Sequence, residues 1–376
     1  MALDSALTTV VRLTVPYPNL STLGGGSEVC LRVEAAADSP QLAQTLAEID
    51  PDRVVRAPDG SIVIEGQLDR LLAGLRGLPS NLGSGLPARA LREALEHLSR
   101  PAPALKLGDA VWEFGQRTYL LGVVNVTPDS FSGDGVGGSP EAALARAQQL
   151  VEEGADGLDI GGESTRPGHQ QITAEEEVRR VVPALELVAG ALSVPIFVDT
   201  SKAAVARAAL AAGADGVNDI WGLRRDPGMA GVVAASQAPV VCMHNQASTD
   251  YEDLLGEVLA QLRESLQLAE RAGIPRSQVV LDPGIGFGKN PAQNYEVLRR
   301  LVELRALGCP ILVGPSRKSL IGWVLDQRPV AGRLLGTAAT VAWSIACGAD
   351  IVRVHDVAQI RDVARVLDVL ARHPPA

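Results

Sequence analysis

The sequence predicts an α/β protein, a (β/α)8 barrel of the TIM type preceded by a small α+β domain. Two observations lead to this fold class. From about residue 106 onward, eight short apolar runs alternate with segments rich in Ala, Leu, Arg and Glu, as strands and helices do in parallel α/β folds. Eight such units in roughly 270 residues also match the usual size of this barrel.

The expected barrel strands are the apolar runs 119–124, 157–160, 195–198, 216–217, 240–243, 279–281, 311–313 and 351–354. The helical segments between them include 140–153, 175–191, 203–212, 252–272 and 292–307. Gly154 and Gly213 stand where two of these helices should stop. A doubly wound open sheet is the alternative, but no GxGxxG motif follows the first run, so the sequence indicates no dinucleotide site.

Residues 1–105 are expected to form the small domain and residues 106–376 the barrel. The predicted elements of the first region are strands at 10–15 and 28–34, a hairpin at 53–65 that turns at Asp59-Gly60, and helices at 67–75 and 88–98. The stretches 78–87 and 101–103 have the composition of linkers. No group of ionisable residues there suggests a reaction, so the role of this domain stays open.

The composition argues against several classes of protein. The net charge is −10 and no run of basic residues occurs, which suits neither nucleic acid nor an anionic membrane surface. The N-terminus lacks a basic region and no apolar stretch reaches membrane-spanning length, so we expect a cytoplasmic protein. The cysteines, none of them in a CxxC pair, are expected to be reduced and buried: Cys30, Cys242, Cys309 and Cys347.

Polar or ionisable residues follow every expected barrel strand. In chain order they are Asn125, Gly161-Gly-Glu-Ser-Thr-Arg-Pro-Gly168, Asp199-Thr-Ser-Lys202, Asn218-Asp219, His244-Asn245, Asp282-Pro-Gly-Ile-Gly-Phe-Gly-Lys289, Gly314-Pro-Ser-Arg-Lys-Ser319 and His355-Asp356. Because the C-terminal ends of barrel strands lie on one face, these loops should converge on a single site.

Some of these loops form a cationic, hydroxyl-rich group. It comprises Ser164-Thr-Arg166, Ser316-Arg-Lys318 and Arg353-Val-His355. A phosphate or diphosphate needs several donors and positive charge at one place, and barrels commonly hold phosphate beside the seventh and eighth strands. This half of the site is therefore predicted to bind a phosphorylated group.

Other strand ends form an acidic group. Asp199 and Asp282, with the amide of Asn218, can pair with a flat heterocycle that carries NH and NH2 donors, as a pterin does. The two halves together predict a site that holds a planar, amidine-bearing ring deeply and a phosphorylated arm nearer the rim.

Eight segments occur in the order in which one known family has them. They are Asn125-Val-Thr-Pro-Asp-Ser-Phe-Ser132, Asp159-Ile-Gly-Gly-Glu-Ser-Thr-Arg-Pro-Gly168, Val198-Asp-Thr-Ser-Lys202, Asn218-Asp-Ile220, Met243-His244, Asp282-Pro-Gly-Ile-Gly-Phe-Gly-Lys289, Gly314-Pro-Ser-Arg-Lys-Ser319 and Arg353-Val-His-Asp-Val357. Over about 110–376 the chain resembles dihydropteroate synthase of folate biosynthesis. The N-terminal region is not part of the usual family core and does not look like the pyrophosphokinase or aldolase partners sometimes fused to it.

The resemblance implies a transferase reaction. The amine of p-aminobenzoate displaces diphosphate from 6-hydroxymethyl-7,8-dihydropterin diphosphate and gives 7,8-dihydropteroate, with early ionisation of the C–O bond and no covalent enzyme intermediate. The resemblance further implies Mg2+ as cofactor, a homodimer formed through helices near the end of the barrel, and inhibition by sulfonamides that mimic p-aminobenzoate.

The resemblance also assigns residues. The expected catalytic residues are Asn125, Asp199, Lys318, Arg353 and His355, with Asn125 as the Mg2+ ligand. The expected pterin contacts are Asp199, Asn218, Asp282 and Lys318, with Met243 and Phe287 beside the ring. Arg353 and His355 would bind diphosphate with help from Arg166. The p-aminobenzoate pocket would consist of Thr165, Arg166, Pro167, Phe131 and Ser316.

Purely structural roles remain open for several of these positions. Asn125 could cap a turn, and Asp199 could cap the helix that starts near Lys202. Met243 and Phe287 could be core residues, and His355 with Asp356 a helix-start pair. His244 is expected to be a structural ring, and Lys202 and Lys289 to be solvated.

Two departures from the family keep other functions open. The first loop has Ser132-Gly-Asp-Gly135, where the family more often has Ser-Asp-Gly-Gly, so Asp134 lies one position later. With the added N-terminal region, this leaves room for a non-catalytic paralogue. A pterin-binding methyltransferase domain is the other alternative, but it should lack the Ser-Thr-Arg-Pro-Gly and Ser-Arg-Lys-Ser segments that this chain has.

Overall fold

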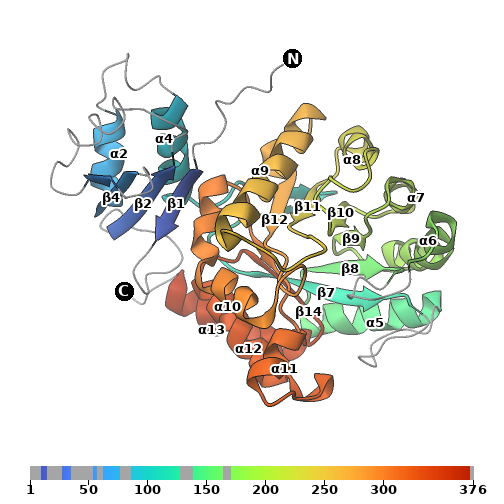
Figure 1. The fold of residues 1–376 in the computed structure, drawn as a ribbon. Helices are drawn as coiled ribbons and strands as arrows, with labels where there is room; N and C mark the ends of the chain where they lie inside the picture. The colour runs from blue at the N-terminus through green and yellow to red at the C-terminus, as the bar shows by residue number, and fades with distance from the viewer. Residues whose placement is uncertain are drawn as a thin grey trace. The chain divides into compact units, whose positions relative to one another are not determined.

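The computed structural model describes residues 10–14, 28–34, 54–56, 62–76, 86–127, 139–163 and 171–372. The chain divides into two compact units (Figure 1). One unit contains residues 1–102 with 300–308, and the other contains residues 103–299 with 309–376.

The second unit is a barrel of eight parallel strands. They are β7 (Tyr119–Asn125), β8 (Gly157–Gly161), β9 (Ile196–Asp199), β10 (Gly216–Asp219), β11 (Val240–Met243), β12 (Val279–Asp282), β13 (Leu312–Val313) and β14 (Ile351–Val354). Strands β7 to β12 pair in chain order, β14 lies between β13 and β7, and a parallel bridge between Leu281 and Ile311 links β12 to β13. The predicted barrel is confirmed, and each expected run forms a strand.

Helices connect the barrel strands. They are α5 (Pro140–Glu153), α6 (Ala174–Ala191), α7 (Ala203–Ala211), α8 (Met229–Ser236), α9 (Leu254–Arg271), α10 (Pro291–Arg299), α11 (Ser319–Val324), α12 (Leu334–Ala346) and α13 (Val357–Ala371), with 3-10 turns η2 (Arg276–Gln278) and η4 (Val330–Gly332). Helix α5 begins after Ser139, whose side chain accepts a hydrogen bond from Ala142 N, and ends at Gly154 with φ +104°. Within the described residues, no helix has the length and apolar character that crossing a membrane requires.

The predicted helix at 292–307 is wrong in its second half. It is split into α10 and a 3-10 helix, η3 (Leu301–Leu307), which belongs to the first unit. There His97 Nδ1 lies 3.1 Å from the carbonyl oxygen of Ala306. Gly308 ends η3 with φ +71°, and a Cβ at this position would lie 2.5 Å from the His97 ring. These tertiary contacts, absent from the local pattern, override the helical propensity of the stretch.

The first unit has the predicted α+β composition. Its strands are β1 (Val10–Thr14), β2 (Glu28–Glu34), β3 (Val54–Arg56) and β4 (Ile62–Gln67), in an antiparallel sheet of order β1-β2-β4-β3. Its helices are α2 (Leu68–Arg76) and α4 (Leu86–Leu98), which bury Leu75, Leu91 and Leu95. The Arg92 guanidinium donates to Leu75 O at 2.9 Å. The predicted turn at Asp59-Gly60 lies outside the described residues.

A short hairpin that the sequence did not predict closes the N-terminal end of the barrel. It pairs β5 (Leu105–Leu107) with β6 (Ala110–Trp112). The Trp112 ring stacks on Tyr119 with centroids 4.7 Å apart, and its centroid lies 6.2 Å from that of Phe197. Tyr119 begins β7 and Phe197 is near the start of β9, so bulky apolar groups fill this end and leave the opposite end for ligands.

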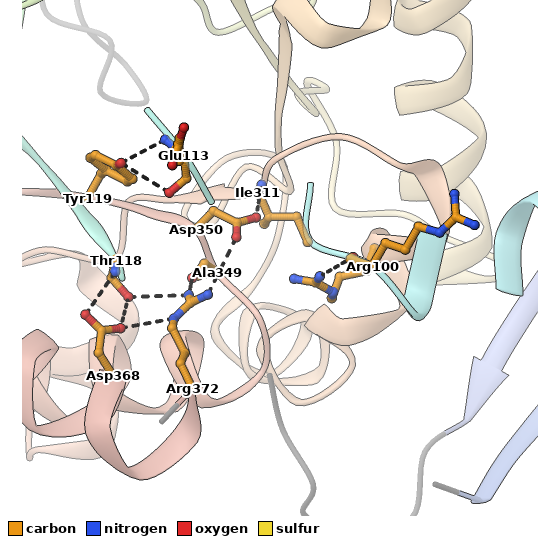
Figure 2. Close-up of polar contacts among 10 residues, drawn as sticks. Arg100, Glu113, Thr118, Tyr119, Ile311, Ala349, Asp350, Asp368 and Arg372 are labelled. Carbon is orange, nitrogen blue, oxygen red and sulfur yellow. Dashed lines mark hydrogen bonds and ion pairs between the residues drawn. The ribbon is translucent and has the colours of Figure 1, made fainter. Parts of the chain in front are cut away.

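A buried arginine joins the last helix to the barrel strands (Figure 2). Arg372, directly after α13, donates to Asp368 at 3.0 Å and to Ala349 O at 2.7 Å, and its side chain is 1% exposed. Asp368 in turn accepts from the hydroxyl of Thr118 at 2.7 Å and from its backbone N at 2.9 Å. Because Thr118 precedes β7 and Ala349 precedes β14, this cluster fixes α13 across the junction of those two strands.

Candidate active site

Two buried carboxylates and one guanidinium form the deepest part of the site. Asp159 comes from β8, Asp199 from the last position of β9 and Arg353 from β14. Arg353 Nε donates to Asp159 Oδ2, and its Nη2 donates to Asp199 Oδ2 at 2.8 Å. Both carboxylates are nearly inaccessible, with Asp159 at 0% and Asp199 at 5% exposure. One arginine therefore neutralises part of the charge of two acids that sit on adjacent strands.

Among the described residues, one oxygen of each carboxylate has no donor. Asn218 Nδ2 donates to Asp159 Oδ2 at 3.2 Å. The Oδ1 atoms of Asp159 and Asp199 are buried and have no hydrogen-bond partner among the described residues. An unpaired buried carboxylate oxygen is costly. This arrangement fits a ligand that brings N–H donors to the floor of the site.

Burial changes the protonation of these groups. It raises the pKa of Asp199 above its ordinary value, and the nearby Asp159 carboxylate adds to the rise while Arg353 opposes it. Burial alone would lower the pKa of Arg353, but Asp159 and Asp199 outweigh it, so the guanidinium stays charged. Asp199 does not cap the following helix, because Asp226 accepts the hydrogen bond from Ala203 N at 2.8 Å.

A third acid lies beside a lysine and an aromatic ring. Asp282 ends β12, and its Oδ1 accepts from Gly284 N at 2.7 Å. Lys318 Nζ donates to Ile285 O and lies 4.6 Å from the centroid of the Phe287 ring. Burial raises the pKa of Asp282, opposed by Lys318. Burial also lowers the pKa of Lys318 to about 8, opposed by Asp282.

The glycine-rich loop after β12 packs closely on the end of β11. Gly284 has φ +70°, and a Cβ there would lie 1.9 Å from His244 O, so only glycine fits. The Lys289 ammonium lies 2.8 Å from His244 Nδ1 and also donates to the carbonyls of Gly284 and Phe287 at 3.2 and 3.1 Å. His244 is thus a buried structural ring, as expected. The expectation that Lys289 is solvated is wrong, because the fold of this loop needs its three donors.

A serine and a histidine link the last two strand ends. Ser316 Oγ lies 3.0 Å from His355 Nδ1 and accepts from His355 N at 3.3 Å. Arg146 of α5 donates to His355 O at 2.7 Å. Ser316 is buried and His355 partly buried. Met243, at the end of β11 and paired in register with Asp282, is 3% exposed.

Asn125 ends β7, opposite Gly161 of β8, and is partly buried. Among the described residues, no group of three or more His, Cys, Asp or Glu side chains could hold a metal ion. A single amide oxygen would suit Mg2+ where substrate phosphates and water supply the other oxygen ligands, as is usual for this ion. The residues present therefore fit a metal that arrives with a phosphorylated substrate.

Several residues expected at the site lie outside the described residues: Phe131, Thr165, Arg166 and Pro167. Glu163, which precedes the Thr165-Arg-Pro167 segment in the sequence, accepts from Ile172 N at 3.1 Å and from Lys202 Nζ at 2.5 Å. Lys202 also donates to the buried Glu177 at 2.5 Å. The expectation that Lys202 is solvated is therefore wrong, since the lysine joins two carboxylates.

Arg317 differs from the expectation that its guanidinium contributes to an anion site. Its Nε and Nη2 donate to the two oxygens of Asp356, with Nε to Oδ2 at 2.9 Å. Asp356 directly follows His355. The cationic group predicted from the loops after β13 and β14 is therefore partly neutralised by an acid from the second of these loops.

The comparisons with known proteins agree with this geometry. Residues 121–355 match the family described as pterin binding enzyme. Dihydropteroate synthase of Synechocystis sp. is 45% identical over 277 residues, which cover 72% of this chain and 96% of the relative. The chain belongs to the dihydropteroate synthase family. The Bacillus subtilis dihydropteroate synthase is 47% identical over 244 residues, covering 65% of this chain and 85% of the relative.

Solved structures of dihydropteroate synthases share the barrel. The Clostridium difficile enzyme, determined in the presence of pteroic acid, superimposes with a TM-score of 0.67 at 48% identity, over 69% of this chain and 99% of that one. The Burkholderia cenocepacia enzyme complexed with 7,8-dihydropteroate gives a TM-score of 0.66 at 38% identity, over 72% and 97% of the two chains.

The sequence did not identify the residues whose role is to hold other side chains of the site in place. Asp159 is within a quoted motif but follows no strand end, because it faces the site from the middle of β8. Its signal was a charged residue inside an otherwise apolar strand, which is rare without a partner. Lys289 and Arg317 gave no such signal, because their partners, His244 and Asp356, lie on other strand ends.

Proposed function

We propose that the C-terminal mouth of the barrel condenses 6-hydroxymethyl-7,8-dihydropterin diphosphate with p-aminobenzoate to give 7,8-dihydropteroate and diphosphate. The observation that carries this proposal is the pair of buried Oδ1 atoms of Asp159 and Asp199, which lack donors among the described residues. A pterin ring supplies N–H and NH2 donors of the right kind. The related Burkholderia cenocepacia enzyme was solved with 7,8-dihydropteroate bound.

The pterin ring binds between the two acidic positions. Asp199 and Asp282 accept from its N–H groups, and Asn218, which is in register with Asp199 and donates to Asp159, offers its amide to the ring. Lys318, which lies over the Phe287 ring, donates to a ring acceptor. Met243 and Phe287 flank the faces of the ring. Substrate binding satisfies the Oδ1 atoms of Asp159 and Asp199, which are buried without donors among the described residues. This gives the site its preference for an amidine edge.

Catalysis consists of positioning and stabilisation of the leaving group. The C–O bond to diphosphate breaks with its electron pair leaving on the diphosphate, the amine of p-aminobenzoate forms the new C–N bond, and one amine proton is released. Arg353 and His355 stabilise the diphosphate charge, and Asp199 and Lys318 hold the ring in the reactive orientation. Thr165, Arg166, Pro167, Phe131 and Ser316 form the p-aminobenzoate pocket.

Asn125 would hold Mg2+ through its amide oxygen, together with the substrate diphosphate. When bound, the ion offsets the negative charge that builds up on the leaving group. Asn125 suits this role because it ends β7 next to Gly161, and because its side chain makes no hydrogen bond to the described residues that would withhold the oxygen.

The protein acts as a cytoplasmic homodimer. Large apolar side chains are exposed on the last helices of the barrel, with Leu335 at 79% on α12 and Leu370 at 67% on α13. Exposed apolar residues of this size are typical of surfaces that a partner covers. Light scattering of the purified protein should give twice the mass of 39.3 kDa.

Steady-state turnover tests the function directly. The purified full-length protein is incubated with Mg2+, the dihydropterin diphosphate and p-aminobenzoate, and 7,8-dihydropteroate is measured. We expect product formation that sulfonamides inhibit in competition with p-aminobenzoate. If no product forms while the pterin still binds, the chain is a non-catalytic paralogue.

A further inference from the structure

Arg317 combines a strained backbone with a position between two site residues. Its φ is +58°, in the left-handed region that side chains with a Cβ rarely adopt. It lies between Ser316 and Lys318, two residues that the proposed function assigns to substrate. Such strain persists only where surrounding contacts impose it, and it is concentrated at functional sites.

Contacts with other described residues hold Arg317 in this conformation. Its backbone N donates to Thr337 Oγ1 of α12 at 3.0 Å, and its carbonyl accepts from the Arg333 guanidinium at 2.9 Å. Its own guanidinium makes the two-pronged ion pair with Asp356, whose side chain is 15% exposed against 19% for Arg317. A two-pronged pair between partly buried groups fixes direction as well as distance.

The left-handed turn aims the flanking side chains at different partners. Ser316 Oγ lies 3.0 Å from His355 Nδ1, whereas Lys318 reaches Ile285 O and the Phe287 ring. Because His355 and Asp356 are consecutive, the Ser316–His355 and Arg317–Asp356 contacts join the loops after β13 and β14 side by side. The Lys318 ammonium is thereby held at a fixed place relative to His355.

We propose that Arg317 is a positioning residue. Its ion pair with Asp356 fixes the turn that directs Ser316 and Lys318. It thereby holds Lys318, which binds the pterin ring, at a fixed position relative to His355, which binds the diphosphate. This inference rests on the proposed function, because it concerns the geometry of the same two substrate groups. It assigns to Arg317 and Asp356 a role in orienting other side chains instead of a substrate contact of their own.

The test compares Arg317→Met, Arg317→Gly and Asp356→Asn in the full-length protein. Arg317→Met removes the ion pair, and Arg317→Gly also relieves the backbone strain, so its folded state should be retained. We expect both to lower kcat/KM for the dihydropterin diphosphate at least tenfold with little change in melting temperature. We also expect the alkaline limb of the pH profile, which reports Lys318, to shift in both variants.

The double variant Arg317→Met/Asp356→Asn tests whether the effects of the two substitutions are energetically coupled. If the two residues act as one unit, the double variant should lose no more activity than the more damaged single variant. Arg276→Met is the matched control, because Arg276 makes an ion pair with Glu270 at 3.0 Å between exposed side chains and should leave kcat/KM unchanged.

Three results would overturn the inference: full activity in Arg317→Gly, an unmoved alkaline limb, or additive losses in the double variant. The wild-type protein separates this inference from the proposed function. Absence of turnover in the wild type refutes the function, whereas normal turnover in both the wild type and Arg317→Met refutes only the positioning role.

Discussion

At the scale of the residue, burial sets the protonation of the groups that hold the pterin. The pKa of Asp199 is raised by burial, so this carboxyl stays protonated over part of the acidic range in which an ordinary aspartate is ionised. The pKa of Lys318 is lowered to about 8, so its charge is lost as the pH rises through that value. The binding form, with Asp199 ionised and Lys318 charged, therefore exists only between these limits.

We predict a bell-shaped pH profile for kcat/KM of the dihydropterin diphosphate, with an alkaline limb near pH 8. In Lys318→Arg the guanidinium stays charged, so the alkaline limb should move beyond pH 9 even though the rate falls. Stopped assays across pH 5 to 10 measure both profiles. A limb that stays near pH 8 in Lys318→Arg would assign it to another group.

We predict that Asn125→Ala raises the Mg2+ concentration needed for half-maximal turnover by on the order of 10-fold. The variant keeps the fold, because Asn125 ends β7 with a partly buried side chain. Titration of Mg2+ at saturating substrates measures the effect. An unchanged requirement would mean that the ion is held by the substrate and other residues alone.

Most of the site residues that the sequence predicted lie at or just after strand ends. Asp282, Lys318 and His355 could be found because barrel geometry brings every strand end to one face. The role of Asp159 could not be predicted in this way, because it depends on a partner from a distant strand. The role of Lys202 could not be predicted either, because it depends on Glu163 and Glu177. Asp159 meets Arg353, which is 194 positions away. Pairings at that separation have no local signal.

At the scale of the element, the glycine loop after β12 depends on a backbone that only glycine can adopt. We predict that Gly284→Ala destabilises the protein by about 2 kcal/mol or more and abolishes pterin binding, because the new Cβ would lie 1.9 Å from His244 O and displace Asp282 and Lys318. Urea unfolding and calorimetric titration with a pterin measure the two effects.

Gly231→Ala in α8 is the control for this substitution. A Cβ at Gly231 meets nothing within 4 Å, so alanine should be neutral or stabilising by up to about 1 kcal/mol through its helix propensity. Equal losses in both variants would show that the loop is not specially constrained.

Regular elements were predictable from the sequence where the hydrophobic period is strong. Helix α5 shows this, with Pro140 and Gly154 marking its ends. The hairpin β5–β6 and the 3-10 helix η3 were not predictable, because both are too short to show a hydrophobic period. Trp112 and Gly308 have their partners, Tyr119 and His97, elsewhere in the chain, so tertiary contact decides these elements.

At the scale of the whole molecule, closure of the barrel depends on the junction of its first and last strands. We predict that Arg372→Ala lowers the free energy of unfolding by about 3–5 kcal/mol, because it leaves the Asp368 carboxylate without its charged partner beside the start of β7. Its effect on KM should be small, since the cluster lies away from the polar strand ends. Chemical denaturation measures the loss.

The control for Arg372 is Arg179→Ala on α6, whose side chain is 73% exposed in its ion pair with Glu176. An exposed pair contributes about 0–1 kcal/mol, so this variant should unfold almost as the wild type does. A similar loss in the two variants would contradict the role given to the buried cluster.

The central claim is that the strand ends of one barrel face bring two acidic positions and a cationic group around a single pterin. A crystal structure of the complex with 7,8-dihydropteroate tests it most directly. We predict ring N–H groups within hydrogen-bond distance of Asp199 and Asp282, with Lys318 donating to a ring acceptor. A ring bound elsewhere, with the Oδ1 atoms of Asp159 and Asp199 still lacking donors among the described residues, would contradict it.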